Sequence, residues 1–424
     1  MSKADSRITT SKKLERAVIV GCGLKSDSFT ELKDSLVELE ELVYAAGAEV
    51  VATSIQVLPK FNSGTLMGTG KVEEIKELVR STEADFVVVD HTLSGSQSRN
   101  LEELLKVKVL DRAQLILDIF AQRAQSYEGK LQVELAQMMD QLPRMVGGWL
   151  GSHSRLAGGI GTRGPGETAL ELDRRRIRKK MDFIKNKLED VRANRAQYRQ
   201  SRKRSKIPSF ALIGYTNAGK STLLNQLTNA HVLVKDQAFA TLDPTTRQVH
   251  LPEIKNVVIT DTVGFIRKLP THLIEAFKAT LEETAEADVL LHVIDLSSPQ
   301  MDAQIEVVNN LMKEFAWTNK PIIFVFNKMD VVTADHHLKA KQFPRVLVSG
   351  LTGQGVPRLK KLMADEILKL SHETELYFPK DQEFKIYELS REAQIVRKES
   401  TSNGTICFVF MTEGQLSKWH EYMA

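Results

Sequence analysis

A buried strand that runs directly into a glycine-rich turn constrains this chain more than any other feature. The apolar residues 210–213 precede the turn, and Thr222 follows it in a predicted helix. The turn reads Gly214-Tyr215-Thr216-Asn217-Ala218-Gly219-Lys220-Ser221, the G-x-x-x-x-G-K-S pattern of a phosphate-binding loop. A strand-to-helix turn without a ligand is the alternative, but the full pattern in this context predicts a nucleotide site.

Each part of this loop has a physical reason. The glycines let the backbone curl tightly enough to aim successive N–H groups at phosphate oxygens. Lys220 adds a positive charge at the β- and γ-phosphates, and Ser221 offers its hydroxyl to Mg²⁺. The loop alone does not say which nucleotide binds.

A second apolar strand ends in a D-x-x-G segment, Asp261-Thr262-Val263-Gly264. The Asp261 carboxylate can hold Mg²⁺ through water, and the Gly264 N–H can reach a γ-phosphate. We therefore expect Ser221 and Asp261 to hold Mg²⁺, and Gly264 to act with Lys220 on the phosphate.

Two further strand ends predict which base is bound. The apolar residues 321–326 deliver Asn327-Lys328-Met329-Asp330, and the strand at 346–348 leads into Ser349-Gly350-Leu351. The Asp330 carboxylate can accept from the guanine N1–H and amine together, whereas adenine would leave it buried and unpaired. Backbone N–H groups of residues 349–351 can meet the guanine O6. The order of these segments predicts a GTP site.

The rest of the chain predicts a multi-domain α/β fold. Strands alternate with helices over residues 15–125, which indicates a parallel sheet. We expect an N-terminal βα domain (15–125), a helical hairpin with a glycine-rich basic tip (126–206), a P-loop GTPase domain (207–370) and a small C-terminal α+β domain (375–424). The last part shows no chemistry, and we interpret it as a docking or interaction module.

The hairpin is predicted from two apolar seams of period 3.5, the spacing of a narrow coiled-coil stripe. One seam is Leu131, Leu135, Met138 and Leu142; the other is Ile177, Met181, Ile184, Leu188 and Val191. Two amphipathic helices packed on the first domain are the alternative. The connection, residues 147–168, holds eight glycines. It has little apolar surface to offset its ordering cost, so we expect a tip that orders on a partner, with a plain linker as the alternative.

Charge is unevenly distributed along the chain. The net charge is +4, but residues 174–206 carry 15 Lys or Arg against three acidic residues. That stretch alone is therefore +12, and the remainder is −8. A concentration of this kind indicates a polyanionic partner.

The motif order, together with residues 159–168 and the following Leu170-Glu171-Leu172-Asp173-Arg174-Arg175-Arg176-Ile177-Arg178, resembles the HflX family of ribosome-associated GTPases. The resemblance covers nearly the whole chain, and the glycine-rich stretch is its family-specific part. It implies binding to the large ribosomal subunit and use of GTP in splitting or rescuing stalled ribosomes. An RNA-binding or RNA-remodelling protein, with the nucleotide as a structural or regulatory ligand, is the competing hypothesis.

The resemblance also implies roles for particular residues. Phe239-Ala240-Thr241-Leu242-Asp243 looks like the first switch, which makes Thr241 a second Mg²⁺ ligand and γ-phosphate sensor. Thr245 and Thr246 compete for that role. Ribosomal RNA would meet Arg174, Arg175, Arg176 and Arg178 at the hairpin root and Arg155 and Arg163 in its tip.

One position departs from Ras-like GTPases. Phe265 follows Gly264, where a glutamine would orient the attacking water, so unaided turnover should be slow and partner-stimulated. Asn217 lies in mid-loop, where GTPases with a similar loop use an asparagine to hold a monovalent cation. We hypothesise that K⁺ bound there assists hydrolysis. The alternative for Asn217 is that it only caps the turn. The alternative to hydrolysis is a protein that only binds GTP.

The composition indicates in which cellular compartment the protein is expected to work. No stretch approaches 18 uninterrupted apolar residues, and the amino terminus lacks a signal-peptide pattern, so a cytoplasmic protein is expected. Cys22 and Cys407 have no metal-ligand spacing and read as reduced core residues. The expected partners are GTP or GDP, Mg²⁺ and the large ribosomal subunit, bound by a monomer.

Overall fold

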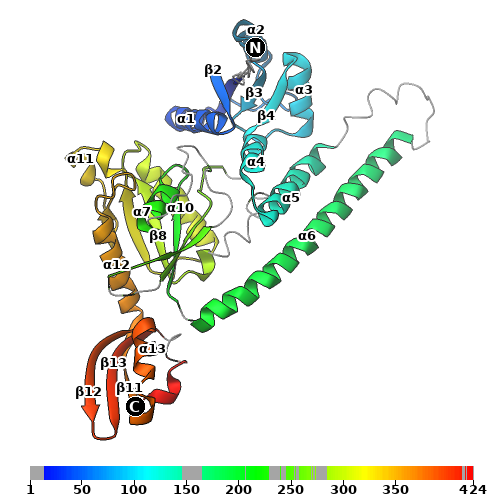
Figure 1. Ribbon diagram of the computed structural model, residues 1–424. Helices are drawn as coiled ribbons and strands as arrows, with labels where there is room; N and C mark the ends of the chain where they lie inside the picture. The colour runs from blue at the N-terminus through cyan, green and yellow to red at the C-terminus, as the bar shows by residue number, and fades with distance from the viewer. Residues whose placement is uncertain are drawn as a thin grey trace, which may run out of the picture. The chain divides into compact units, whose positions relative to one another are not determined.

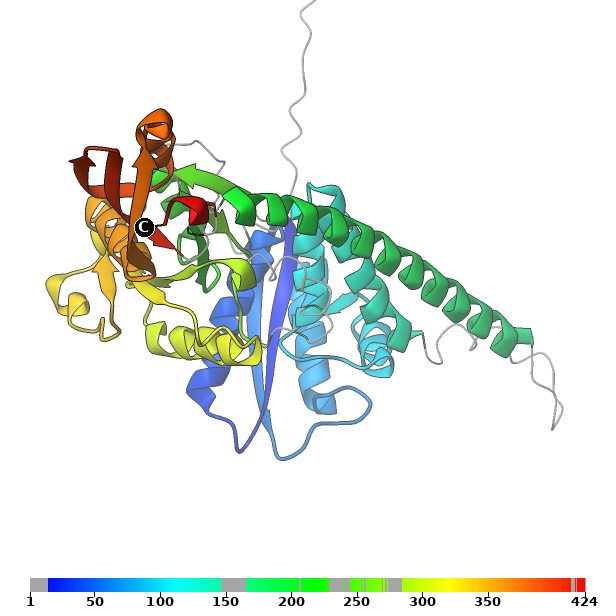
Figure 2. The ribbon, with the colours of Figure 1, turned by 90° about the horizontal axis from the view of Figure 1, so that it is seen from below.

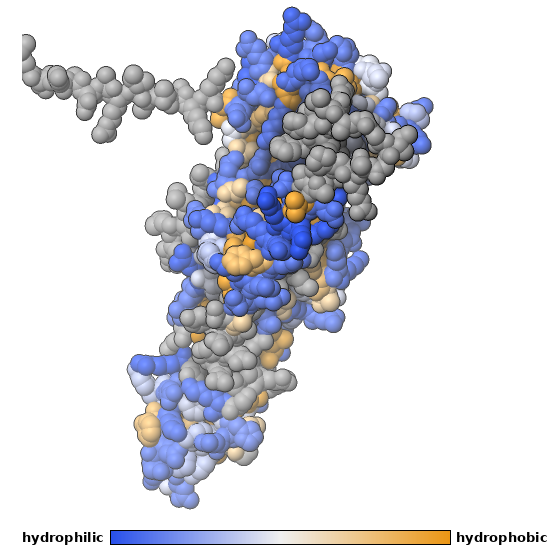
Figure 3. Space-filling model, turned by 90° about the vertical axis from the view of Figure 1, so that its right-hand side faces the viewer, coloured by the Kyte–Doolittle hydropathy of each residue, from blue (hydrophilic) through white to orange (hydrophobic). Residues whose placement is uncertain are grey.

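The computed structural model describes residues 14–145, 165–205, 207–228, 239, 245–252, 254, 257–268, 270, 273, 284–412, 416 and 418–423. The chain divides into two compact units (Figure 1): Met1–Gln122 with Ala136–Met181, and Arg123–Leu135 with Asp182–Ala424. Among the described helices, none combines the length and hydropathy needed to cross a membrane. On the face drawn in Figure 3, the coloured residues are mostly hydrophilic with isolated apolar spots.

The first unit contains a four-stranded parallel sheet in the order β2-β1-β3-β4. Its strands are β1 (Glu15–Leu24), β2 (Ala48–Leu58), β3 (Phe86–Val89) and β4 (Lys108–Asp111). The helices are α1 (Phe29–Ala45), α2 (Thr69–Thr82), α3 (Gly95–Leu105) and α4 (Arg112–Arg123). All four residues of β3 are buried, as expected for a parallel strand covered on both faces. The predicted parallel βα architecture is confirmed.

Two long helices follow, α5 (Tyr127–Arg144) and α6 (Pro165–Ser205), and α6 is seen along its length in Figure 2. Because α6 begins at Pro165, the last four residues of the predicted connection belong to the helix. Within the second unit, Leu131, Leu135, Ile184 and Leu188 are all buried. Each helix therefore buries part of its predicted seam, while Leu142, Ile177, Met181 and Val191 are half-buried. The domain boundaries themselves remain predictions.

The second unit is built on a six-stranded sheet in the order β10-β9-β8-β5-β7-β6. The strands are β5 (Ser209–Gly214), β6 (Thr245–Val249), β7 (Val257–Asp261), β8 (Val289–Asp295), β9 (Ile322–Asn327) and β10 (Arg345–Leu347). All pairs are parallel except β6 with β7. The predicted strands therefore end at one edge of the sheet, where ligands bind in open α/β folds.

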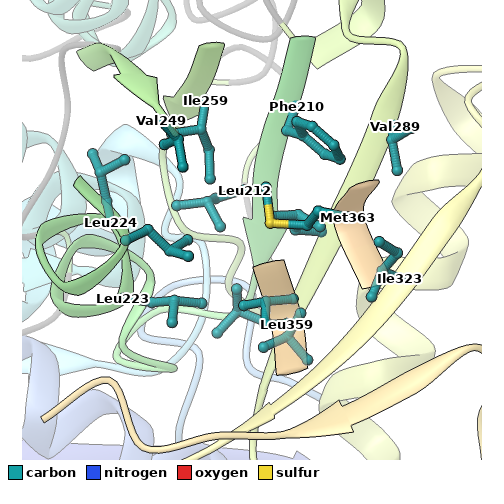
Figure 4. Close-up of a cluster of buried hydrophobic side chains, with 14 of the residues drawn as sticks. Phe210, Leu212, Leu223, Leu224, Val249, Ile259, Val289, Ile323, Leu359 and Met363 are labelled. Carbon is teal, nitrogen blue, oxygen red and sulfur yellow. The ribbon is translucent and has the colours of Figure 1, made fainter. Parts of the chain in front are cut away.

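Helices cover both faces of this sheet. The core in Figure 4 includes Leu223 and Leu224 from α7 (Lys220–Thr228), and Leu359 and Met363 from α12 (Val356–Lys369). On the other face, α10 (Met301–Glu314) packs on the sheet through Val308 and Met312. Short turns η2 (Met329–Val331) and α11 (Ala334–His337) connect β9 to β10.

The chain ends in an antiparallel sheet of order β11-β13-β12. Its elements are β11 (Ser371–Pro379), η3 (Lys380–Gln382), α13 (Lys385–Glu392), β12 (Gln394–Thr401), β13 (Gly404–Thr412) and η4 (His420–Tyr422). Its core joins Leu376, Phe378 and Leu389 to Cys407. Cys22 and Cys407 are both buried and free of disulfides.

Candidate functional site

The glycine-rich loop connects β5 to α7 by a backbone path that glycine alone fits at two positions. A Cβ at Gly214, whose φ is +147°, would lie 2.2 Å from the Val293 carbonyl oxygen. A Cβ at Gly219, at φ +88°, would lie 2.2 Å from Asn327 Nδ2. These close approaches bring the loop against the ends of β8 and β9, and α7 begins at Lys220 with its N-terminus at the loop.

Lys220 is buried inside this loop. Its Nζ donates to the Gly214 carbonyl at 3.1 Å and to the Tyr215 carbonyl at 2.7 Å. Burial lowers the pKa of Lys220 to about 8, and the Asp261 charge partly opposes that shift. A desolvated ammonium that donates to neutral carbonyls is stabilised when an anion binds beside it.

Two of the three predicted Mg²⁺ ligands, Ser221 and Asp261, meet directly. Ser221 Oγ at the start of α7 donates to Asp261 Oδ2 at the end of β7, at 2.5 Å. Thr262, completely buried, donates its hydroxyl to the Leu212 carbonyl at 2.6 Å, which holds the end of β7 beside β5. A hydroxyl and a carboxylate side by side are the oxygen donors that Mg²⁺ prefers, so the residues present fit this ion.

The first-switch residues are only partly described. Phe239 is buried, whereas Ala240, Thr241, Leu242 and Asp243 lie outside the described residues. Thr246, one of the two competitors for the role of Thr241, pairs its hydroxyl with Thr260 at 2.9 Å. The Thr246 hydroxyl is therefore engaged in a contact between strands β6 and β7.

The D-x-x-G segment lies against the glycine-rich loop. The Phe265 N–H donates to the Gly214 carbonyl at 3.0 Å, and the Thr216 N–H donates to the Phe265 carbonyl at 2.8 Å. Tyr215 adds a side-chain contact, because its Oη accepts from the Arg267 N–H at 2.9 Å. These three hydrogen bonds, made just after the D-x-x-G segment, add to the Ser221–Asp261 bond in holding the segment beside the loop.

The Phe265 ring is buried in the core rather than presented at the loop. It is 3% exposed and belongs to the cluster of Ala211, Ile213 and Leu290 under α10. A ring in this position can neither accept from nor donate to a water molecule, which agrees with the expectation that Phe265 does not orient one.

Asn327 connects the loop to the base-recognition segments. Its Nδ2 donates to the Ala218 carbonyl at 2.9 Å, and its Oδ1 accepts from the Gly350 N–H at 2.8 Å. The Ser349 N–H donates to the Gln354 carbonyl at 2.9 Å. Since these two amides already have acceptors, the Leu351 amide is the better candidate for the guanine O6. Asp330 and Leu351 are exposed, as an open base site requires.

One contributor, Asp295, was missed by the sequence reasoning. Lys328, in the left-handed region at φ +63°, places its Nζ 2.8 Å from Asp295 Oδ2. The same carboxylate accepts from the Ser297 N–H at 2.9 Å and from its hydroxyl at 2.5 Å. Asp295 ends β8 directly beside Asn327 of β9. An acidic residue at the end of a buried parallel strand is the signal that could have identified it.

The candidate RNA contacts lie elsewhere. Arg175, Arg176 and Arg178 are exposed on α6, and Arg174 is half-buried. Arg176 pairs with Asp173 at 3.2 Å on the surface, a contact of little energetic weight. Arg155 and Arg163 lie outside the described residues.

Replacing Gly264 by Ala should loosen the D-x-x-G segment from the loop. An added Cβ would lie 2.9 Å from both Lys220 Nζ and Thr216 Cα, and the backbone atom cannot give way cheaply. A strain of about 1–3 kcal/mol should raise amide hydrogen exchange at Thr216 and Phe265 by about tenfold or more. The matched control is Gly70→Ala in α2, where a Cβ meets nothing within 4 Å. Unchanged exchange at both amides would contradict the contact.

Comparison with known proteins matches three family models in succession. Residues 33–121 match the GTP-binding GTPase N-terminal family, residues 123–202 the GTP-binding GTPase middle region, and residues 209–328 the family described as 50S ribosome-binding GTPase. A solved GTP-binding protein from the archaeon Sulfolobus solfataricus, in complex with GDP, is 24% identical with a TM-score of 0.45, covering 84% of this chain and 100% of that one.

Curated relatives match over most of the chain. A GTPase HflX of Caldanaerobacter subterraneus subsp. tengcongensis is 46% identical over 391 residues, which cover 92% of this chain and 89% of that protein. The GTPase HflX of Escherichia coli K12 is 46% identical over 351 residues, 80% of this chain and 81% of the relative. Identity at this level over most of the chain, and not over the phosphate-binding loop alone, shows that the chain belongs to the HflX family of GTPases.

Proposed function

We propose that this GTPase binds GTP with Mg²⁺ at the edge of the six-stranded sheet and couples its hydrolysis to binding of the large ribosomal subunit, splitting or rescuing stalled ribosomes. The observation that carries the nucleotide part is the direct contact among the loop, Asp261, Gly264 and Asn327. Segments that follow three strands, β5, β7 and β9, meet there through hydrogen bonds and close approaches, although the first and last lie more than a hundred residues apart in sequence.

The chain's own groups would divide the work as follows. Lys220 and the loop amides bind the β- and γ-phosphates, and the Gly264 amide reaches the γ-phosphate. Ser221, Asp261 and Thr241 would hold Mg²⁺, which neutralises charge on the phosphate oxygens. Asp330 accepts from the guanine, while Asp295 holds the Lys328 stem in place beside the base. The Leu351 amide meets O6.

Asp330→Asn tests the base assignment. Losing the carboxylate should weaken GTP binding by about 1–3 kcal/mol, the cost of leaving a polar group without its partner. Xanthosine triphosphate should gain, because its C2 carbonyl accepts where the guanine amine donated. Competitive titration of the two nucleotides measures the change, and unchanged discrimination between them would contradict the role of Asp330.

The Phe265 ring lies in the core and cannot orient the attacking water. Hydrolysis therefore needs another group to stabilise its transition state. We propose that K⁺, held with the help of Asn217, supplies positive charge beside the phosphates. The backbone of Asn217 is left-handed at φ +60°, which an asparagine also adopts as a simple turn residue. Turnover should therefore be faster in K⁺ than in Na⁺ at matched ionic strength, and Asn217→Ala should remove the difference. Equal rates in both salts would leave Asn217 as a turn residue only.

The ribosomal part rests on charge and on the family. Residues 174–206 carry a net charge of +12, and Arg175, Arg176 and Arg178 at the root of α6 are exposed. The family model matched by residues 209–328 is described as a 50S ribosome-binding GTPase. Large ribosomal subunits offer the polyanion to which such a helix is complementary. We further propose, as the sequence led us to expect, that the protein acts as a monomer in the cytoplasm.

The competing function is an RNA-binding or RNA-remodelling protein that uses GTP only as a structural or regulatory ligand. The basic helix α6 is the observation that favours this competing function. GTP turnover with and without purified large subunits separates the two, because only a ribosome-coupled GTPase is stimulated.

Deleting residues 147–165 tests the tip. GTP affinity should stay near the parent value, because no GTP motif lies there, while ribosome stimulation and subunit splitting should be largely lost. Replacing Arg174, Arg175 and Arg176 by Ala should instead weaken subunit binding and flatten its salt dependence, by about 0.7–0.9 in slope per lost phosphate contact. Co-sedimentation with large subunits across a salt series, beside turnover, measures both. A tip-deleted protein that splits ribosomes at the parent rate would show that the tip is a linker.

A further inference from the structure

Two large aromatic side chains stand exposed where α5 and α6 meet. Tyr127 at the start of α5 is 59% exposed, and Phe183 on α6 is 57% exposed. Lys187 joins them: its Nζ lies 4.7 Å from the centre of the Phe183 ring and 5.8 Å from that of Tyr127. The same Nζ donates to Tyr127 Oη at 3.1 Å. We refer to these three residues as the aromatic step.

Packing between α5 and α6 does not explain why Phe183 stands beside Lys187 with its ring exposed. The residue after Phe183, Ile184, is 2% exposed and Leu188 is 5% exposed, so the seam is filled by its neighbours. A phenylalanine with more than half of its surface in water adds little to the burial that stabilises helices. The contacts with Lys187 instead hold both rings in defined orientations while leaving ring surface open.

The surroundings of the aromatic step are basic. Lys130 on α5 and Lys185 on α6 are exposed beside it in sequence. Residues 182–205 of α6 carry eight Lys or Arg against three acidic residues. An apolar partner surface would have to desolvate these charges, whereas a nucleic acid would pair with them.

We propose that the aromatic step binds an unpaired nucleotide of RNA, with the base stacked on Phe183 and Tyr127 and its phosphate on the Lys187 ammonium. This rests on the RNA partner of the proposed function and names a site for it. Single-stranded nucleotides expose the faces of their bases, and aromatic rings beside cations are the surface that binds such bases without reading their sequence. A paired duplex keeps its bases stacked inside and cannot use the step.

The test compares the full-length protein with variants of the step. Phe183→Leu keeps an apolar helix former but removes the ring, and Phe183→Trp keeps a ring. Leu172→Ala is the matched control, because Leu172 is an aliphatic side chain on the same helix with 53% exposure. The probes are a fluorescent oligo(A) single strand and an RNA duplex of equal phosphate number, titrated by anisotropy over a salt series.

Phe183→Leu should weaken single-strand binding by about five- to a hundredfold, the measured range for loss of one stacked base, and leave the salt slope unchanged. Phe183→Trp should restore it. Lys187→Met should flatten the slope by about 0.7, because one phosphate contact is lost. Duplex affinity should stay constant in the two Phe183 variants, and GTP affinity should stay constant in all variants.

Two results would overturn the proposal. The first is a Phe183→Leu protein that binds the single strand as tightly as its parent, or no more weakly than the Leu172→Ala control. The second is loss of large-subunit binding in Phe183→Leu with oligonucleotide binding intact, which would assign the patch to a protein. If large subunits do not stimulate GTP turnover by the parent protein, the proposed ribosomal function is wrong. The oligonucleotide titrations would still show whether the aromatic step binds an unpaired nucleotide.

Discussion

The side-chain amide of Asn327 links the loops on which the nucleotide site depends. It donates to the loop after β5 through the Ala218 carbonyl and accepts from the segment after β10 through the Gly350 amide. Asn327 is 2% exposed, so removing either partner would strand a polar group away from water. The phosphate-binding and base-binding segments are therefore positioned together by one residue at the end of a central strand.

A second link couples the site to the core. Gly264, expected to sense the γ-phosphate, precedes Phe265, whose backbone is bonded to the loop and whose ring is anchored under α10. Moving the segment onto a phosphate would break two backbone hydrogen bonds, and releasing the ring would cost about 1.5–3 kcal/mol of apolar burial. A bound nucleotide or partner can bias an element of this kind between two arrangements.

The long basic helix α6 depends on a different interaction, long-range electrostatics. At 41 residues and 1.5 Å per residue, α6 extends about 60 Å. Its sequence carries many more basic than acidic residues, so salt or a polyanion would relieve the repulsion among its lysines and arginines. The GTP site depends on buried and directional contacts, whereas this surface depends on long-range charge, and the two should respond differently to ionic strength.

Much of the GTP site was determined by the sequence alone, because its parts are local. A glycine needed at positive φ, a carboxylate at a strand end and a continuous apolar strand all show in a short window, as with residues 214–221 and Asn327–Asp330. The Ser402-Asn403-Gly404 turn between β12 and β13 is another local signal, typical of a hairpin, and the two strands pair antiparallel.

Only the tertiary structure decided the contacts between distant segments. Periodicity shows that Ile184 is buried, but not that Phe183 beside it stays in water with Lys187 across its face. Likewise, the strand pattern does not show that Asp295 holds Lys328, that Tyr215 accepts from the Arg267 amide, or that the Phe265 ring lies in the core. The physical reason is that a sequence pattern records which face of an element avoids water, while the partner it meets depends on strand order, here β10-β9-β8-β5-β7-β6.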